Sequence, residues 1–270
     1  MTFKLLVMDL DGTILPSEGS ISSRVKTAIR EVQDQGVLAT LASGRTFASM
    51  VIFARELGIS APLICHQGAL VKDPVTGRVF YEDLIPVDVM RDVVVHAREH
   101  HLHLNVYIDD ETYMERSNGE IELYSRLSRI QHQAVPDLLA ALKQNPTKCI
   151  WVSETPEKSD ALLPLLQQSF GSRLSVVRSH PYLIEGVPLG VSKGKALAFL
   201  AGCLGITQAE TVAIGDSDND ADMLQWAGLG LAMGNSTPLV LTVADCVVPS
   251  IDDDGVAFAI ERYVLDGSRL

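Results

Sequence analysis

The chain opens with short, largely continuous apolar runs separated by stretches in which apolar residues recur at helical spacing. The first run, residues 3–8, is rich in strand formers and does not alternate, which predicts a strand buried on both faces. A helix is expected next, with Ser22 or Ser23 as its N-cap and Gly36 as its stop. The pattern continues with a strand, a helix and a short strand at residues 37–42, 46–57 and 63–65. This order predicts parallel strands joined by right-handed crossovers.

The pattern changes after about Val71. Residues 73–77 are typical of a turn between two hairpin strands. The region up to about Glu185 then mixes a helix near 87–100, a strand near 103–108 and further elements. The first pattern returns afterwards, with helices and strands at residues 195–204, 211–214, 221–227, 230–233, 245–248 and 255–264.

An α/β core therefore occurs twice, with a different region between its two parts. We predict a Rossmann-like parallel-sheet core made of residues 1–83 and 188–270. Residues 84–187 are expected to form an inserted α+β domain, since about 100 residues is an ordinary domain size.

Composition excludes several classes of protein. The chain has 270 residues, 47% of them apolar, which argues against disorder. Its formal charge of -12 provides no general attraction to nucleic acid or to an anionic membrane, so a site for an anionic substrate would need a local cation. No apolar run is long enough to span a membrane, and the four cysteines are widely separated. We expect a cytoplasmic protein in which all four cysteines are reduced core residues.

Asp9 and Asp11 directly follow the first predicted strand. Carboxylates at the carboxyl end of a buried strand are costly unless a cation lies near them, and this end of an open α/β sheet is where ligands bind. Magnesium prefers such oxygen ligands, and a carboxylate can attack phosphorus. The alternative is an acidic turn, because Asp-Gly is common in turns. The motif alone leaves both interpretations open.

A second acidic cluster, Asp216, Asp218 and Asp220, follows the strand predicted at 211–214. Three carboxylates this close repel one another unless something positive lies among them. Capping of the following helix explains Asp218 or Asp220 but explains Asp216 poorly.

Two further motifs lie at helix starts. Ser43, Gly44 and Arg45 offer a hydroxyl and backbone N–H groups that suit a phosphate oxygen. For this tripeptide alone, a plain loop and N-cap is the favoured explanation. Lys193 lies at a helix N-terminus, where the helix dipole disfavours a cation. Its position makes sense if it reaches a phosphate or a carboxylate, whereas Lys195 is expected on the surface. A histidine cluster at 96–103 lacks the ligand pattern of a zinc site, so a solvated helix end is expected there.

The four motifs, in this order, resemble those of the haloacid dehalogenase-like hydrolase superfamily. The motifs are Asp9-x-Asp11-Gly-Thr13, Ser43-Gly44-Arg45, Ser-Lys193-Gly and Gly-Asp216-x-x-Asn219-Asp220. The inserted middle and the sequence around Lys193 resemble the Cof-type branch, which carries a type IIB cap domain. One position departs from that branch: the third strand is usually followed by Asn-Gly-Ala, and Gln67 replaces the asparagine here.

The resemblance implies a magnesium-dependent phosphatase that acts on small phosphorylated metabolites such as sugar phosphates or phosphorylated cofactors. Asp9 would be the nucleophile and Asp11 the acid and base. The ion would be held by the Asp9 carboxylate, the Asp11 carbonyl and Asp216. Phosphate oxygens would be bound by Ser43, Gly44 and Lys193. The groups around these ligands would be Thr13, Asn219 and Asp220.

The resemblance also implies that the inserted cap chooses the leaving group. Arg45 and Glu185 lie near the expected domain junction, where each could be structural or substrate-binding. Three alternatives remain: a phosphotransferase or phosphomutase on the same scaffold, a receiver-like signalling module that accepts phosphate, and a catalytically silent binding protein. Neither nucleic acid nor a membrane is expected as a partner, and the sequence leaves the oligomeric state open.

Overall fold

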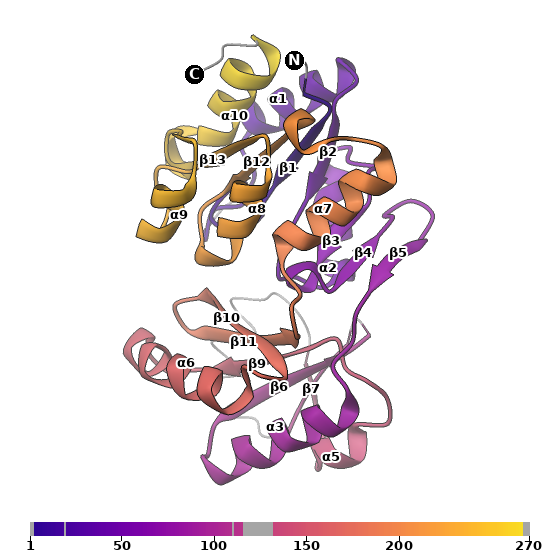
Figure 1. The fold of residues 1–270 in the computed structure, drawn as a ribbon, viewed down its shortest axis with the longest axis vertical. Helices are drawn as coiled ribbons and strands as arrows, with labels where there is room; N and C mark the ends of the chain where they lie inside the picture. The colour runs from indigo at the N-terminus through magenta and orange to yellow at the C-terminus, as the bar shows by residue number, and fades with distance from the viewer. Residues whose placement is uncertain (1–2, 19, 110, 116–131, 267–270) are drawn as a thin grey trace. The chain divides into compact units, whose positions relative to one another are not determined.

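The computed structural model describes residues 3–18, 20–109, 111–115 and 132–266. The chain divides into two compact units (Figure 1). The core unit consists of Met1–Tyr81 and Ser192–Leu270, and the inserted unit of Glu82–Val191. Part of the predicted middle region, residues 116–131, lies outside the described residues.

The main sheet of the core unit is parallel throughout, with strand order β14-β13-β12-β1-β2. Its strands are β1 (Leu5–Met8), β2 (Leu38–Leu41), β12 (Thr211–Gly215), β13 (Leu229–Ala232) and β14 (Cys246–Val247). β1 lies between β12 and β2, pairing Met8 with Ile214 on one side and with Leu41 on the other. Strands from both ends of the chain thus form one sheet, and the predicted α/β class is confirmed.

Helices cover both faces of this sheet. Successive strand residues point to opposite sides, so each strand packs against the helices on both faces. Leu6 and Met8 pack in the cluster that includes α1, α2 and α10, whereas Leu5 and Val7 pack in the cluster that includes α7, α8 and α9 (Figure 1). The helices are α1 (Ser23–Asp34), α2 (Phe47–Glu56), α7 (Lys193–Leu204), α8 (Ala221–Trp226), α9 (Pro238–Val243) and α10 (Gly255–Ala259). The short helical turns of the core unit are η1 (His66–Gly68), η2 (Gln208–Glu210), η3 (Asp218–Asp220), η4 (Ile251–Asp253) and η5 (Ile260–Leu265).

Hydroxyl side chains fix where the helices begin. Ser22 caps α1 and Thr46 caps α2, each accepting a hydrogen bond from a backbone N–H in the first turn. Ser192 caps α7 in the same way, so this helix begins at Lys193, two residues before the predicted start at 195. The last predicted helix is also altered, because α10 ends at Ala259 and the chain continues as the short π-helix η5.

A separate three-stranded sheet follows α2. It contains β3 (Leu63–Cys65), β4 (Leu70–Lys72) and β5 (Val79–Glu82) in that order. A parallel bridge between Ala42 and Ile64 links β3 to the residue after β2. Asp73 closes the predicted turn by accepting hydrogen bonds at 2.8 Å from the N–H groups of Val75 and Thr76.

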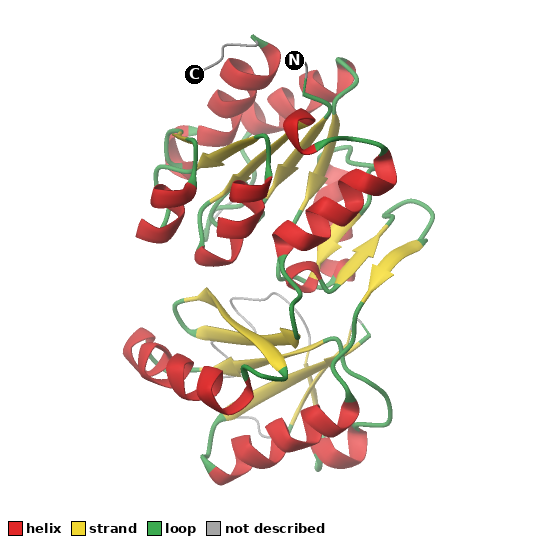
Figure 2. Ribbon diagram, in the orientation of Figure 1, coloured by secondary structure: helices red, strands yellow, loops and turns green. Residues whose placement is uncertain are grey.

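The inserted unit is built on a mixed sheet of order β10-β11-β9-β6-β7-β8, in which the described strand pairs are antiparallel except for β7 with β8. The helices α3 and α6 lie along one side of it (Figure 2). Trp151 is enclosed in the apolar cluster on that side. The strands are β6 (His103–Ile108), β7 (Glu111–Met114), β8 (His132–Ala134), β9 (Lys148–Val152), β10 (Leu174–His180) and β11 (Leu183–Pro188). The helices are α3 (Val87–Glu99), α5 (Leu138–Ala141) and α6 (Pro156–Phe170).

The composition led to one expectation about membrane-spanning segments and one about the cysteines. Within the described ranges, no helix combines the length and apolar character needed to cross a membrane. All four cysteines are free, but only Cys65 and Cys149 are buried, whereas Cys203 is exposed. The prediction that every cysteine belongs to the core is therefore wrong, because the helix α7 presents position 203 to solvent.

Candidate active site

Asp9 is the first residue after β1, at the carboxyl end of the parallel sheet. Its N–H group donates to the carbonyl of Ile214 on β12 at 2.9 Å, so the backbone of Asp9 still follows the sheet. Its side chain is enclosed (Asp9 is 4% exposed). A buried carboxylate at this edge of the sheet is held away from water, which makes its charge costly unless cations or donors surround it.

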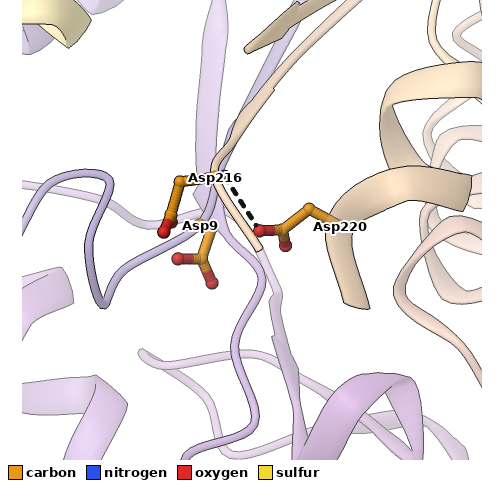
Figure 3. A group of neighbouring side chains, drawn as sticks. All are labelled: Asp9, Asp216 and Asp220. Carbon is orange, nitrogen blue, oxygen red and sulfur yellow. Dashed lines mark hydrogen bonds between the residues drawn. The ribbon is translucent and has the colours of Figure 1, made fainter. Parts of the chain in front are cut away.

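Three carboxylates gather at this point: oxygen atoms of Asp9, Asp216 and Asp220 all lie within 4.8 Å of one another. Figure 3 shows the carboxylates of Asp9 and Asp216 next to each other at the ends of β1 and β12, and the carboxylate of Asp220 approaching them from the turn η3. One oxygen of Asp220 accepts hydrogen bonds from the N–H groups of Asp216 at 3.1 Å and Ser217 at 3.0 Å. Asp220 therefore both closes its own turn and contributes charge to the cluster.

Lys193 supplies positive charge to the cluster. Its Nζ atom donates to Asp9 and to Asp220, each at 2.6 Å, and the lysine is 1% exposed. As the first residue of α7, it stands where the helix dipole disfavours a cation. Its two ion pairs compensate for that placement. Lys195, two residues later, is exposed as expected.

The buried charges shift one another's protonation. Burial, reinforced by the charge of Asp220, raises the pKa of Asp9 well above its ordinary value, although Lys193 opposes the shift. The same causes raise the pKa of Asp216 to about 6. Burial disfavours the ammonium of Lys193, but the carboxylates of Asp220 and Asp9 outweigh that effect and raise its pKa. The cluster thus carries more negative charge than its surroundings stabilise.

The donor set fits a divalent cation. Three carboxylates and one ammonium leave two negative charges uncompensated. Both oxygens of Asp220 are engaged by the Lys193 ammonium or by backbone N–H groups, whereas those of Asp216 accept from the neutral hydroxyls of Thr13 and Ser217. Asp9 accepts from Lys193 through one of its two oxygens, so Asp9 and Asp216 are the better ligands. All the ligand atoms are oxygens, which suits a hard cation such as Mg²⁺. Among the described residues, this cluster is the one group of three acidic, histidine or cysteine side chains placed to hold a metal ion.

The loop after Asp9 is held against Asp216. The hydroxyl of Thr13, itself buried, donates to Asp216 at 2.8 Å. Gly12 has φ +85°, and a Cβ there would lie 2.6 Å from an oxygen of Asp216, so only glycine fits both the conformation and the space. The side-chain amide of Asn235 donates to the carbonyl of Gly12 at 2.9 Å. The sequence motifs did not single out Asn235, which lies in the loop after β13.

Asp11 forms an ion pair with Arg45 that the sequence did not predict. Two N–H groups of Arg45 donate to its two carboxylate oxygens, each at 2.7 Å. The Asp11 side chain is half exposed, whereas only 13% of the Arg45 side chain is exposed. Arg45 also donates to the hydroxyl of Ser49 at 3.2 Å. Arg45 is therefore fixed in the core unit, where it holds Asp11 in one orientation.

Ser43 lies at the carboxyl end of β2, the strand next to β1. It is 2% exposed, and its hydroxyl accepts from the N–H of Arg45 at 3.2 Å. The helix α2 takes Thr46 as its N-cap, so the simple capping explanation of Ser43 is wrong. Gly44 is partly buried in the turn between Ser43 and this helix.

Two other positions singled out from the sequence lie elsewhere. Asn219 donates to the side-chain oxygen of Gln67 at 2.8 Å, so its hydrogen bond joins η3 to the turn after β3. Glu185 lies on β11 of the inserted unit, where it forms a buried ion pair with Lys148 at 2.6 Å. The sequence drew attention to Gln67 because it departs from the family pattern. It did not indicate that Asn219 is the partner of Gln67.

Known proteins resemble the chain over nearly its whole length. A profile described as haloacid dehalogenase-like hydrolase matches residues 6–260. A 5-amino-6-(5-phospho-D-ribitylamino)uracil phosphatase of Bacillus subtilis is 30% identical and aligns over 97% of this chain and 96% of its own. The phosphatase YwpJ of the same organism is 29% identical over 97% of this chain and 100% of its own.

Solved structures give the same result. A haloacid dehalogenase-like hydrolase from Bacteroides thetaiotaomicron superposes with a TM-score of 0.87 at 33% identity, covering 97% of this chain and 99% of its own. The family and enzyme class predicted from the sequence are confirmed. The chain belongs to the haloacid dehalogenase-like hydrolase family and is a phosphatase.

Proposed function

We propose that the chain is a magnesium-dependent phosphatase that hydrolyses small phosphorylated metabolites through an aspartyl-phosphate on Asp9. The observation that carries this proposal is the environment of Asp9: a buried carboxylate at the carboxyl end of β1, 2.6 Å from the Lys193 ammonium and adjacent to Asp216. This arrangement combines a nucleophile with positive charge that can bind a phosphoryl group.

In the first step, a carboxylate oxygen of Asp9 attacks phosphorus while the bond from phosphorus to the leaving oxygen breaks. Asp11 gives its proton to that oxygen, which leaves as an alcohol. In the second step, Asp11 takes a proton from water, whose oxygen attacks the phosphoryl group and releases Asp9. Both oxygens of Asp11 accept from Arg45 in the structure, so Asp11 has to leave this ion pair before it can carry the proton. Its half-exposed side chain leaves room for that movement.

The surrounding groups would hold the phosphoryl oxygens and the ion. Lys193, Ser43 and the N–H of Gly44 would bind the phosphoryl oxygens. Mg²⁺ would be held by the carboxylates of Asp9 and Asp216 and by the backbone carbonyl of Asp11, supplying positive charge beside the phosphate. The hydrogen bond from Thr13 supports Asp216 as a ligand.

The substrate class is inferred from the chemistry of the site and from the relatives. A ribitylaminouracil phosphatase among them acts on a small phosphorylated metabolite, as its name states. Sugar phosphates and phosphorylated cofactors belong to the same chemical class. We further propose that residues 84–187 form the cap that selects the leaving group.

A phosphate-release assay over a panel of phosphorylated metabolites, with and without Mg²⁺, tests the proposal. We expect turnover that requires the metal and disappears in Asp9→Asn, because an amide cannot serve as the nucleophile. Asp9→Asn also removes a charge that burial disfavours, so the metal-free variant should fold at least as stably as the native chain. Full activity in Asp9→Asn would refute the role of Asp9, and formation of phosphosugars in place of free phosphate would indicate a phosphotransferase.

A further inference from the structure

The turn between β3 and β4 has an unusual backbone. His66, Gln67 and Gly68 have φ values of 50°, 60° and 100°, so three consecutive residues lie in the left-handed region. Only glycine adopts this region without cost, and the penalty for another residue is about 1–2 kcal/mol. The strands that it joins pair Cys65 with Leu70. Four-residue hairpin loops are most often built around a type I turn, whose central residues have negative φ, so the connection alone does not require three left-handed residues.

The turn is held by the loops that carry the site. The N–H of Gln67 donates to the carbonyl of Ser43 at 3.1 Å. Gly68 packs against the residue before Lys193, since a Cβ at Gly68 would lie 2.3 Å from the carbonyl oxygen of Ser192. The strained turn therefore touches both the loop after β2 and the start of α7.

A third connection runs through the Gln67 side chain, which is 2% exposed. Its oxygen accepts a hydrogen bond at 2.8 Å from the amide of Asn219. Asn219 is the middle residue of η3, and the next residue, Asp220, receives the hydrogen bond from Lys193. The oxygen of Asn219 is buried and has no donor among the described residues, so its orientation depends on the bond to Gln67.

We propose that Gln67 is a positioning residue, which holds Asn219 and thereby fixes η3 so that Asp220 aligns Lys193 with Asp9. This inference rests on the proposed function of Lys193 and Asp9. Strain of this kind persists where surrounding contacts determine the conformation, and it concentrates at functional sites. Here the left-handed conformation of Gln67 delivers its side chain to Asn219, which accounts for the cost.

Three substitutions separate this role from a structural one. Gln67→Met keeps the length of the side chain but cannot accept the hydrogen bond. Gln67→Asn is one methylene too short to reach Asn219 from the same backbone, yet asparagine tolerates left-handed φ better than glutamine. The matched control is Gln33→Met, which removes the 3.2 Å hydrogen bond from Gln33, near the end of α1, to the carbonyl of Leu57 at the end of α2.

The assay compares kcat, KM and the urea midpoint of the full chain with Mg²⁺. Gln67→Met should lower kcat about three- to tenfold, the range expected from losing one hydrogen bond, while KM changes less. Gln67→Asn should lower kcat similarly while its urea midpoint stays equal to the native one or rises. Gln33→Met should leave kcat unchanged. Native kcat in Gln67→Met, or native activity in Gln67→Asn, would overturn the inference.

The side-chain amide signal of Asn219, followed by nuclear magnetic resonance, tests the contact without any turnover. The signal should shift in Gln67→Met and stay in place in Gln33→Met. If the native chain releases no phosphate, the proposed function fails. Independently of turnover, an Asn219 signal that does not respond to Gln67→Met refutes the positioning contact. An active native enzyme whose Gln67→Met variant keeps full kcat refutes the positioning role alone.

Discussion

The Nζ atom of Lys193 lies 2.6 Å from a carboxylate oxygen of Asp220, and both side chains are fully enclosed (1% and 0% exposed). Asp220 is itself fixed, because its other oxygen accepts from two backbone N–H groups of its own turn. Lys193 is therefore anchored on one side by Asp220 and directed on the other toward Asp9. A buried pair of this kind is costly to break, because the partner that remains is an uncompensated charge.

Removing this ammonium should destabilise the protein strongly. Lys193→Met leaves Asp9, Asp216 and Asp220 without their cation, and we expect a loss of about 3–5 kcal/mol in the free energy of unfolding near neutral pH without metal. Burial already raises the pKa of Asp9 and Asp216, and the variant lacks the opposing charge of Lys193, so protons stabilise the folded variant and the loss should shrink on acidification. Urea denaturation at pH 5 and pH 7.5 measures both effects.

The matched control is Lys195→Met, which removes an exposed lysine from the same helix. It should change the unfolding free energy little at either pH. Equal losses in the two variants, or a loss in Lys193→Met that does not depend on pH, would contradict the buried-pair explanation.

Metal binding should compete with protons at Asp216. The pKa of this carboxyl is about 6 in the folded chain, against an ordinary value of 3.8, and burial is the main cause. Between these two values the folded chain binds more protons than the unfolded one, so this group makes the metal-free protein less stable as the pH rises through that window. A bound cation relieves the repulsion. Thermal denaturation should therefore show a larger stabilisation by Mg²⁺ at pH 7.5 than at pH 5, and an equal stabilisation at both would exclude Asp216 as a ligand.

The parts of the site that the sequence predicts are those governed by the sheet. Asp9 and Asp216 follow buried apolar runs, and parallel strands bring the ends of such runs to one edge. Lys193 could be singled out because its place at a helix start is unfavourable unless it reaches an anion. These inferences need only local pattern and topology, and the structure brings the three side chains together.

Side-chain pairs between loops are a different case. The contact of Arg45 with Asp11 spans 34 positions and that of Asn219 with Gln67 spans 152, and both depend on loop conformations that hydrophobic patterning does not determine. The left-handed φ of Gln67 is a conformation that no propensity would assign to glutamine. The early start of α7 has a related cause, because the cap at Ser192 outweighs the poor helix propensity of a glycine in the first turn.

Loss of Asp11 should affect poor leaving groups most. Asp11→Asn cannot protonate an alkoxide, so an alkyl phosphate should lose about 10²–10⁴-fold in kcat, whereas an aryl phosphate with an acidic phenol should be cleaved in a fast first step. The variant also lacks the base for hydrolysis of the phosphoenzyme. Stopped-flow absorbance with an aryl phosphate should therefore show a burst of phenol followed by slow turnover.

The fold should survive this change, because the ion pair of Asp11 with Arg45 is partly exposed and contributes about 0–1 kcal/mol. The urea midpoint of Asp11→Asn provides the check. A variant that is equally slow on aryl and alkyl phosphates and shows no burst would mean that Asp11 is not the acid and base.

Thr13 should affect the affinity for Mg²⁺ and not the rate of the chemical steps. Its buried hydroxyl donates to Asp216 at 2.8 Å, and Thr13→Val keeps the shape while removing that donor. Groups that orient a metal ligand typically change metal affinity about 10–100-fold when removed. We therefore expect the Mg²⁺ concentration for half-maximal activity to rise by that order, with kcat at saturating Mg²⁺ close to native. Calorimetric titration with Mg²⁺ alone gives the same affinity without turnover.

Thr40→Val is the matched control for this substitution. Thr40 is equally buried in the core unit and lies on β2, before the residues that form the site. Its hydroxyl donates to the carbonyl of Pro62 at 2.6 Å. Both variants lose one buried hydrogen bond, so both should unfold at somewhat lower urea concentration. Only Thr13→Val should also weaken Mg²⁺ binding, because only its hydroxyl contacts a carboxylate of the acidic cluster. If the two variants bind Mg²⁺ equally well, Asp216 does not need Thr13 in order to hold the ion.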